Sequence, residues 1–311
     1  MSYVIVPISL GGSPNRGVFS PPVQERTSLE LIPSLLTHYQ EHRGHIDEIG
    51  FFHGGVLEPD VLSLIDGYRW RLSTHPLDCS RAHALRYIDE GISTIELEAL
   101  SLCDDVLSGI RAGYSTGFLA QQISYFQEQG VRVGMVLSPG MFRSSFAHCI
   151  RTVQACIDLG VSFVRLYPVC VYKGTKLEEW WKAGRYKPLS IPETVTILRE
   201  MMDRLSLAEI EVIRVGRHDA HDGLIESVAG PKHSNLRGLV EQRRFFDKIT
   251  AQLCAQDDDI VRIIVHPKDV SLAKGVQGDT IRLLRARLER ELVLEVDEAV
   301  PRGEVWTKKT Q

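Results

Sequence analysis

The amino-acid sequence predicts an α/β protein: a partial (β/α)6 TIM-like barrel with a C-terminal α+β lobe. Six short apolar runs alternate with segments of helical spacing, and only a few residues connect each run to the next segment. This alternation is typical of parallel βα units, which wind right-handed into a barrel. After Val169 the regular alternation ends. We therefore assign residues 1–190 to the barrel and residues 191–311 to the lobe.

The barrel elements follow from apolar spacing and from the residues that begin or end helices. In the first helix, Leu29, Ile32 and Leu36 recur at helical spacing. Gly91 and Gly130 end two later helices, because glycine readily takes the left-handed conformation found there. The predicted strands are residues 3–8, 46–52, 69–73, 92–97, 131–137 and 163–167. The predicted helices are residues 27–39, 59–67, 80–90, 116–129 and 144–159, and residues 101–113 hold a short helix and a loop.

The lobe mixes helices and strands without the barrel's regular alternation. Pro192 stands in the first turn of its first helix, a position that favours proline. Helices are predicted over residues 189–205, 235–254 and 278–290, and strands over residues 211–215, 260–266 and 291–296. The last residues, from Lys308 to Gln311, are expected to fray.

Composition limits the classes of partner. The chain has 311 residues and a net charge of −4, which gives no field suited to nucleic acid. No apolar run approaches the roughly 18 to 20 residues that span a bilayer, and the N-terminus lacks the features of a signal peptide. We therefore expect a cytoplasmic protein with no membrane contact. The six cysteines form no CxxC pair, and we expect them to be buried free thiols.

In a βα barrel the loops that follow the strands form one reactive mouth. Five such places converge here: Gly11–Pro22, His53–Gly55, Glu96, Ser138–Gly140 and the segment after Tyr167. If Ile95 and Leu97 face the helices, Glu96 and Glu98 face the interior of the barrel.

Several of these segments resemble one family. The loop GGSPNRGVFSPP carries Ser13, Gly17 and Ser20 at the spacing of a CxxxCxxC motif. Further resemblances lie in IGFFHGG, RLSTHP, IELEALSLCDDVL, VRLYPVCVYKGTKLEEWWKAGRYKPLS and VAGPKHSNLRGLVEQRRF. In this order they resemble the radical S-adenosylmethionine (SAM) superfamily, in the branch of elongator protein 3 and the oxygen-independent coproporphyrinogen oxidases. The similarity runs from about residue 3 to residue 270.

The resemblance implies a SAM site, but the cluster positions depart from the family. A [4Fe–4S] cluster of this class needs three thiolates, whereas Ser13 and Ser20 are poor ligands and Gly17 has no side chain. We therefore expect a degenerate member without the cluster. By resemblance, Gly54 and Gly55 accept the SAM amino group. A carboxylate inside the barrel is costly unless it is paired or meets a ligand cation, so Glu96 is predicted to contact the SAM sulfonium or the ribose.

Two further contacts complete the predicted site. Ser138, Pro139 and Gly140 form an adenine-side loop by resemblance, and His53 is the local acid–base candidate.

Each assignment has a structural alternative. The glycine pair serves equally well as a tight turn, His53 as a solvated loop residue and Ser138–Gly140 as an ordinary Pro-Gly turn. Glu96 is equally suited to an ion pair with Arg71 or Arg165. The remaining candidates are a basic lip for an anionic substrate (Lys173, Arg185, Lys187), a weak metal motif (His218, Asp219, His221, Asp222) and Trp180–Trp181 as packing between the two domains.

Besides a radical enzyme whose cluster is supplied unusually, two functions are consistent with this pattern. In the first, the protein binds SAM or a related nucleoside and performs polar transfer or elimination on a small-molecule substrate, as a transferase or lyase without radical chemistry. In the second, it is a catalytically inactive partner or scaffold for a cluster-bearing relative. Retention of Gly54–Gly55 and Glu96 favours the first, and loss of all three cluster positions favours the second.

Overall fold

The computed structural model describes residues 4–13, 15, 17, 26–52, 57, 59–216, 227–254, 260–275 and 278–309. The chain forms two compact units, Met1–Ser234 and Asn235–Gln311. None of the helices in the described ranges has the length and hydropathy of a membrane span.

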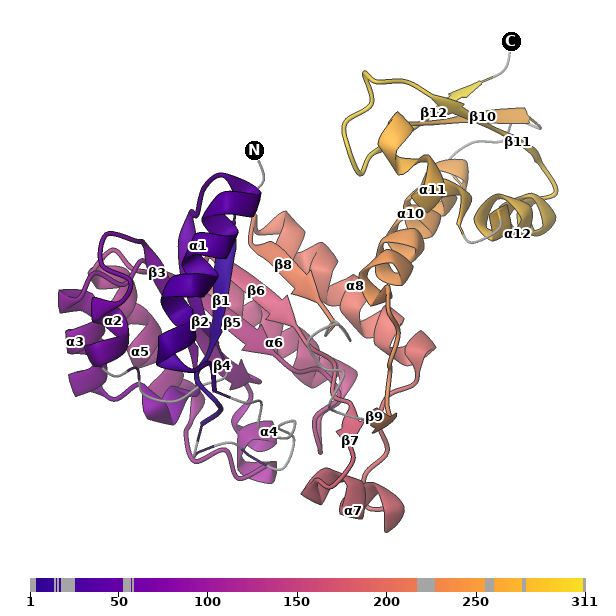
Figure 1. The fold of residues 1–311 in the computed structure, drawn as a ribbon. Helices are drawn as coiled ribbons and strands as arrows, with labels where there is room; N and C mark the ends of the chain where they lie inside the picture. The colour runs from indigo at the N-terminus through magenta and orange to yellow at the C-terminus, as the bar shows by residue number, and fades with distance from the viewer. Residues whose placement is uncertain are drawn as a thin grey trace. The chain divides into compact units, whose positions relative to one another are not determined.

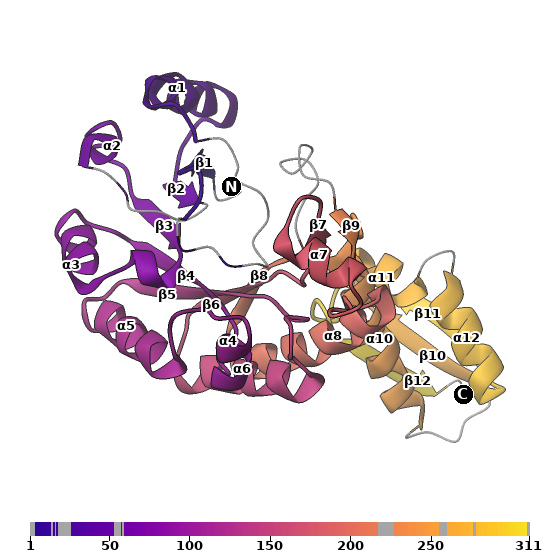
Figure 2. The same ribbon diagram turned by 90° about the horizontal axis from the view of Figure 1, so that it is seen from below.

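The first unit is built on seven parallel strands that curl into a half-barrel, as Figures 1 and 2 show. They are β1 (Ile5–Ser9), β2 (Glu48–Phe52), β3 (Trp70–Thr74), β4 (Thr94–Leu100), β5 (Arg132–Leu137), β6 (Phe163–Leu166) and β8 (Glu211–Val215). Their order in the sheet is β1-β2-β3-β4-β5-β6-β8. Each strand therefore lies beside the strand of this sheet that precedes it in sequence, as expected of right-handed βα units.

Helices cover the outer side of this sheet (Figure 2). They are α1 (Ile32–Arg43), α2 (Pro59–Ser63), α3 (Arg81–Asp89), α5 (Thr116–Glu128), α6 (Phe146–Asp158) and α8 (Ile191–Leu207). The same unit contains the short helices η1 (Leu29–Leu31), η2 (Pro76–Asp78) and α4 (Asp104–Gly109), of which α4 lies at the lower end of the half-barrel in Figure 1. Serine side chains cap several of them. Ser80, Ser115 and Ser190 each accept a backbone N–H of the first turn, which satisfies a donor that the helix leaves open.

Alternate residues of the strands face the two sides of the sheet. Leu72, Ile95 and Val133 occupy one row and are buried apolar side chains of the outer face. The next row faces inward and contains Gly134 beside Phe163. A Cβ atom on Gly134 would lie 2.2 Å from the Phe163 ring, so the ring needs a glycine at this position.

The half-barrel extends further along the chain than the sequence analysis placed it. We assigned residues from 191 onward to the lobe, whereas the units divide between Ser234 and Asn235. Because β8 pairs in parallel with β6, the segment β6–α8–β8 is a seventh strand unit of the barrel rather than the start of the lobe. The amphipathic helix α8 buries Leu198 and Met201 and packs on α6. The sequence predicted this helix but did not indicate that it packs on α6.

A small excursion follows β6 at the lower end of the half-barrel in Figure 1. It contains β7 (Val171–Tyr172), α7 (Lys176–Lys182) and β9 (Ser227–Ala229), and β7 pairs antiparallel with β9. The sequence analysis assigned no element to these residues. Two- and three-residue strands are too short to produce a readable alternation.

The second unit has its own apolar core. Its elements are α10 (Leu236–Cys254), β10 (Ile260–Val265), η3 (Pro267–Asp269), α11 (Val270–Lys274), α12 (Asp279–Leu288), β11 (Glu291–Val296) and β12 (Val305–Lys309). The sheet order is β11-β10-β12, with Ile249, Ile263 and Leu284 among the core residues. The predicted strands at 260–266 and 291–296 are confirmed. The expected fraying of Lys308 is wrong, because Lys308 lies in β12 and pairs with Arg262 of β10.

Candidate functional site

Four charged side chains from four strands meet inside the half-barrel. Glu48 begins β2, and Arg71, Glu96 and Arg165 lie on β3, β4 and β6. Arg165 donates from Nε to Glu96 Oε2 at 2.6 Å and from Nη2 to Glu96 Oε1 at 3.0 Å. Arg71 Nη1 lies 3.2 Å from Glu96 Oε1, and Arg71 Nε lies 2.9 Å from Glu48 Oε2 without the alignment of a hydrogen bond. We call these four residues the interior charge network.

The interior charge network balances two carboxylates with two guanidinium groups. Glu96 is fully buried, and Arg165 is 8% exposed. Burial alone would lower the pKa of Arg165, but the charges of Glu96 and Tyr167 and the hydrogen bonds to them outweigh burial and raise that pKa above its usual value. A buried carboxylate is stable only with such partners, so Glu96 is held in place by both arginines.

The sequence placed Glu96 on the inner face, and the structure confirms that position. Its ion pairs with Arg71 and Arg165 are those of the structural alternative. A contact between Glu96 and a ligand stays a prediction.

A second polar group lies nearer the carboxyl ends of β3 and β4. It consists of Ser73, His75, Glu98 and Tyr114, which we call the mouth cluster. The Ser73 hydroxyl donates to Glu98 Oε1 at 3.4 Å. The rings of His75 and Tyr114 meet edge to face with centroids 5.5 Å apart, and the Tyr114 hydroxyl donates to the Ala99 carbonyl at 3.1 Å. Glu98 is half-buried, so it lies closer to solvent than Glu96.

The two rings of the mouth cluster are uncharged at neutral pH. Burial lowers the pKa of His75, and the opposing charge of Asp78 only moderates the effect. His75 Nδ1 accepts the N–H of Leu77 at 3.2 Å, so the ring proton is on Nε2. Burial, and secondarily the charge of Glu98, raises the pKa of Tyr114. The cluster therefore presents a carboxylate beside two neutral rings.

The sequence analysis gave the mouth cluster no role. It placed Glu98 on the inner face, included Ser73 and His75 only within the segment RLSTHP, and did not consider Tyr114. Strand parity is the signal that finds two of them, because Ser73 and Glu98 each stand two residues beyond a member of the interior charge network.

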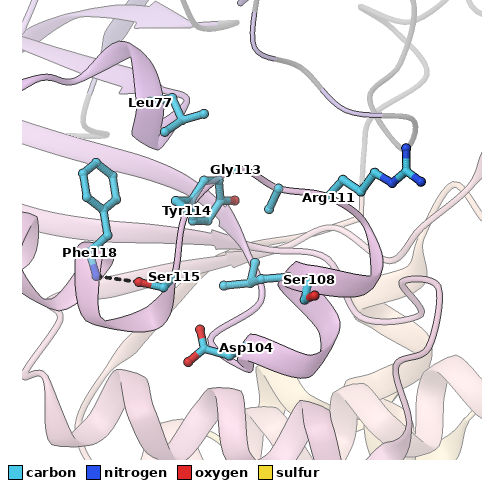
Figure 3. Close-up of a pocket in the computed structure, with 10 residues that line it drawn as sticks. Leu77, Asp104, Ser108, Arg111, Gly113, Tyr114, Ser115 and Phe118 are labelled. Atoms are coloured by element: carbon cyan, nitrogen blue, oxygen red, sulfur yellow. Dashed lines mark hydrogen bonds between the residues drawn. The ribbon is translucent and has the colours of Figure 1, made fainter.

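A pocket of about 630 Å³ adjoins Tyr114, a size suited to a small molecule. Figure 3 shows Leu77, Tyr114 and Phe118 on one side of it and Asp104 on the other. Asp104 is already engaged, since it accepts the backbone N–H and the hydroxyl of Thr116 at the start of α5. The pocket therefore offers mainly apolar contacts, with Tyr114 shared between it and the mouth cluster.

The loop after β1 does not fit an iron–sulfur cluster. Ser13 is buried, and its hydroxyl oxygen accepts the N–H of Asn15 at 2.9 Å. Gly17 offers no donor atom, and Ser20 lies outside the described residues. Three thiolates are the donor set that a [4Fe–4S] cluster of this class requires. Among the described residues, no three His, Cys, Asp or Glu side chains are grouped as metal ligands.

Several predicted site residues lie outside the described ranges. They are His53, Gly54 and Gly55, and the weak metal motif His218, Asp219, His221 and Asp222. Their predicted roles stay predictions.

The loop Ser138–Gly140 is described and tightly packed. Gly140 has a φ of +92°, and its carbonyl accepts the Tyr186 hydroxyl at 2.7 Å. The Pro139 carbonyl accepts the N–H of Val169 at 3.0 Å. These contacts connect the loop after β5 to the segment after β6. The adenine contact predicted for Ser138, Pro139 and Gly140 stays a prediction.

Comparison with known proteins shows similarity to one family. The model of the radical SAM C-terminal domain matches residues 161–244. A tRNA uridine(34) acetyltransferase of Dehalococcoides mccartyi is 31% identical over 120 residues, covering 38% of this chain and 26% of the relative. The human elongator complex protein 3 is 26% identical over 175 residues, covering 55% of this chain and 31% of the relative. The chain thus spans about a third or less of the length of these curated relatives.

The fold has a close structural counterpart. The archaeal elongator protein 3 of Methanocaldococcus infernus, solved with an N-terminal deletion, superposes with a TM-score of 0.61 at 19% identity. The match covers 80% of this chain and 63% of that structure. The half-barrel, the C-terminal family model and the curated relatives agree with the segments noted in the sequence. The sequence comparisons thus make this chain similar to the radical SAM superfamily, in the branch of elongator protein 3.

Proposed function

We propose that this protein binds SAM or a related nucleoside at the mouth of its half-barrel without an iron–sulfur cluster, and that it supports polar transfer or elimination instead of radical chemistry. The observation that carries the proposal is the position of Tyr114. Its pKa is raised by burial and by the charge of Glu98, and it also lines the adjoining pocket. Tyr114 therefore lies both near the Glu98 carboxylate and at the wall of a pocket large enough for a ligand.

We assign the ligand contact to Glu98 rather than to Glu96. Both oxygens of Glu96 are bound by guanidinium groups, so a ligand cation would have to displace an arginine. Glu98 is half-buried at the carboxyl end of β4, where loops form the reactive mouth of such barrels. Its carboxylate can accept ribose hydroxyls or face a sulfonium cation. The apolar pocket beside Tyr114 suits the remainder of the nucleoside.

SAM would supply an electrophilic carbon next to its sulfonium, which a nucleophile attacks without any electron donor. The role of this chain would be to orient the ligand and to stabilise the positive charge before transfer. Because the first curated relatives are named for tRNA, a nucleoside carried by RNA is the acceptor class that we propose.

The test is calorimetric titration of the iron-free full chain with SAM. We expect binding in the micromolar range, and a loss of at least ten-fold in Glu98→Gln. Glu128→Gln removes an exposed carboxylate from α5 and serves as the matched control. Titration with S-adenosylhomocysteine, which lacks the sulfonium charge, reports whether Glu98 faces that charge. No heat at millimolar SAM in the wild-type chain would refute the proposal.

The second candidate function is a non-catalytic partner of a cluster-bearing relative. The hydrogen-bonded Ser13 and the missing side chain of Gly17 favour it, since neither can replace a thiolate. Co-purification of a tagged chain with such a relative, together with absence of SAM binding by the chain alone, would support this function over the first.

A further inference from the structure

The last strand of the half-barrel carries an arginine, Arg214, next to its carboxyl end. This strand, β8, ends the sheet and pairs with β6 (Figure 1). Arg214 is half-buried, and its Nε atom is shielded from solvent without a hydrogen-bond partner. In the part of the chain that the structure describes, no carboxylate forms an ion pair with it. The described residues therefore leave this guanidinium charge uncompensated.

An irregular pairing between β8 and β6 turns Arg214 to the inner face. Val212 and Val215 are both buried, and both pair with residues of β6 that face the helices. In a regular strand, residues three positions apart face opposite sides. The register shifts between Val164 and Arg165, so that β8 has one extra residue at this point. Such a bulge re-aims a side chain, and Arg214 pairs with the inward-facing Arg165.

The other charges on this inner face are already paired. Glu96 accepts two hydrogen bonds from Arg165 and forms an ion pair with Arg71, which also pairs with Glu48. The interior charge network is therefore balanced by itself. Arg214 adds a fifth charge, of the same sign as its neighbour on β6. Together these five side chains carry one positive charge in excess.

Two other arginines have a similar Nε atom, and each has a partner for the rest of its guanidinium group. Arg71 forms its ion pairs with Glu48 and Glu96. Arg86 donates from Nη2 to the Leu57 carbonyl. Within the described ranges, Arg214 has neither kind of contact. Its environment therefore differs from that of an arginine with a structural role.

We propose that Arg214 binds an oxyanion of a small molecule, a carboxylate or a phosphate, on the inner face of the half-barrel. A guanidinium group presents parallel N–H donors that match both anions. A partly buried charge without a partner costs free energy, and a ligand of opposite charge recovers it. The carboxyl ends of the strands are also where barrels of this kind bind ligands.

This anion site goes beyond the proposed function, because it involves neither Glu98 nor SAM. The sequence analysis placed an anionic substrate at the basic lip of Lys173, Arg185 and Lys187, and that assignment stays a prediction. It gave Arg214 no role, since the alternation of a regular strand does not reveal the bulge.

The experiment follows thermal unfolding of the full chain by calorimetry in inorganic phosphate, in succinate and in chloride of equal ionic strength. Arg214→Met removes the charge and keeps an apolar stem. Arg132→Met is the matched control, because Arg132 is exposed and its ion pair with Glu211 lies at the opposite end of β8. Arg214→Lys keeps the charge but not the paired donors.

Phosphate at about 20 mM should raise the melting temperature of the wild type by about 4 °C, for a dissociation constant of about 1 mM. Arg132→Met should show the same rise, Arg214→Lys part of it, and Arg214→Met about 1 °C or less. The stabilising effect of phosphate as an excluded salt is common to all variants. A larger rise in phosphate than in succinate would identify a phosphate ligand, and the reverse a carboxylate.

Without ligand, Arg214→Met should melt no lower than the wild type, because it removes a charge that has no partner. The inference is overturned if the variant melts well below Arg132→Met, which would give Arg214 a structural role. It is also overturned if neither anion distinguishes Arg214→Met from the wild type. Glu98→Gln should leave the response to phosphate unchanged, so loss of SAM binding with an intact phosphate response refutes only the proposed function.

Discussion

Removal of Arg165 tests whether the interior charge network holds the half-barrel together. In Arg165→Met, Glu96 Oε2 loses its hydrogen-bond partner at 2.6 Å, and Oε1 keeps only Arg71 at 3.2 Å. Breaking a buried ion pair from one side costs about 3–5 kcal/mol, because the remaining charge is left without compensation. Since Arg71 still neutralises part of Glu96, we expect a loss of about 3 kcal/mol. Equilibrium urea unfolding followed by far-UV circular dichroism measures it.

The double variant Glu96→Gln/Arg165→Met provides the decisive comparison. It removes both charges and leaves Arg71 beside Glu48, so we expect it to regain about 2 kcal/mol relative to Arg165→Met. Arg204→Met is the control, because its ion pair with Glu200 is at the surface of α8 and should contribute less than about 1 kcal/mol. If Arg165→Met costs no more than this control, or if the coupling with Glu96 is near zero, our reasoning about the network is wrong.

Three further predictions concern packing, protonation and thiol reactivity. Gly134→Ala should destabilise the protein by about 1–3 kcal/mol, because the added methyl group clashes with the Phe163 ring. Adding Phe163→Leu to Gly134→Ala should restore part of the lost stability, as measured by urea unfolding. Equal stability of Gly134→Ala and the wild type would contradict the contact. Burial lowers the pKa of His75 in the folded protein, so the unfolded chain binds this proton more readily. The free energy of unfolding should therefore fall as the pH drops from about 7 through the ordinary histidine pKa near 6.5. His75→Asn should flatten that slope in pH-dependent thermal melts, while an unchanged slope would exclude His75 as its source. Burial raises the pKa of Cys156 to about 12, whereas Cys254 is exposed. Ellman's reagent should therefore label Cys254 first and Cys156 only on unfolding, and a Cys254→Ser variant that keeps the fast phase would refute this.

Much of the fold was predictable because its helices and strands carry strong local signals. Apolar runs with clear boundaries located the strands of residues 70–74 and 132–137, and Gly91 and Gly130 located the ends of the helices α3 and α5. The division of the chain was less accessible. The sequence of the strand Glu211–Val215 fits a strand of the lobe as well as a strand of the barrel. Only its parallel pairing with β6 shows that it belongs to the barrel.

The candidate site was predictable only in part. Strand parity placed Glu96 inside and named Arg71 and Arg165 as alternative partners, since all three depend on position along a strand. Tyr114 belongs to a segment between α4 and α5, where no periodicity indicates the direction of a side chain. Arg214 faces inward because of the irregular pairing between β6 and β8, and such a shift follows from tertiary packing rather than from local sequence.

The balanced charges inside the half-barrel have a consequence for what the fold requires. Because the interior charge network contains both the carboxylates and the arginines that neutralise them, its charges are paired without a bound ion or cofactor. The stability of the sheet is then separate from the chemistry of the loop after β1, because Ser13 and Gly17 neutralise no charge of the interior charge network.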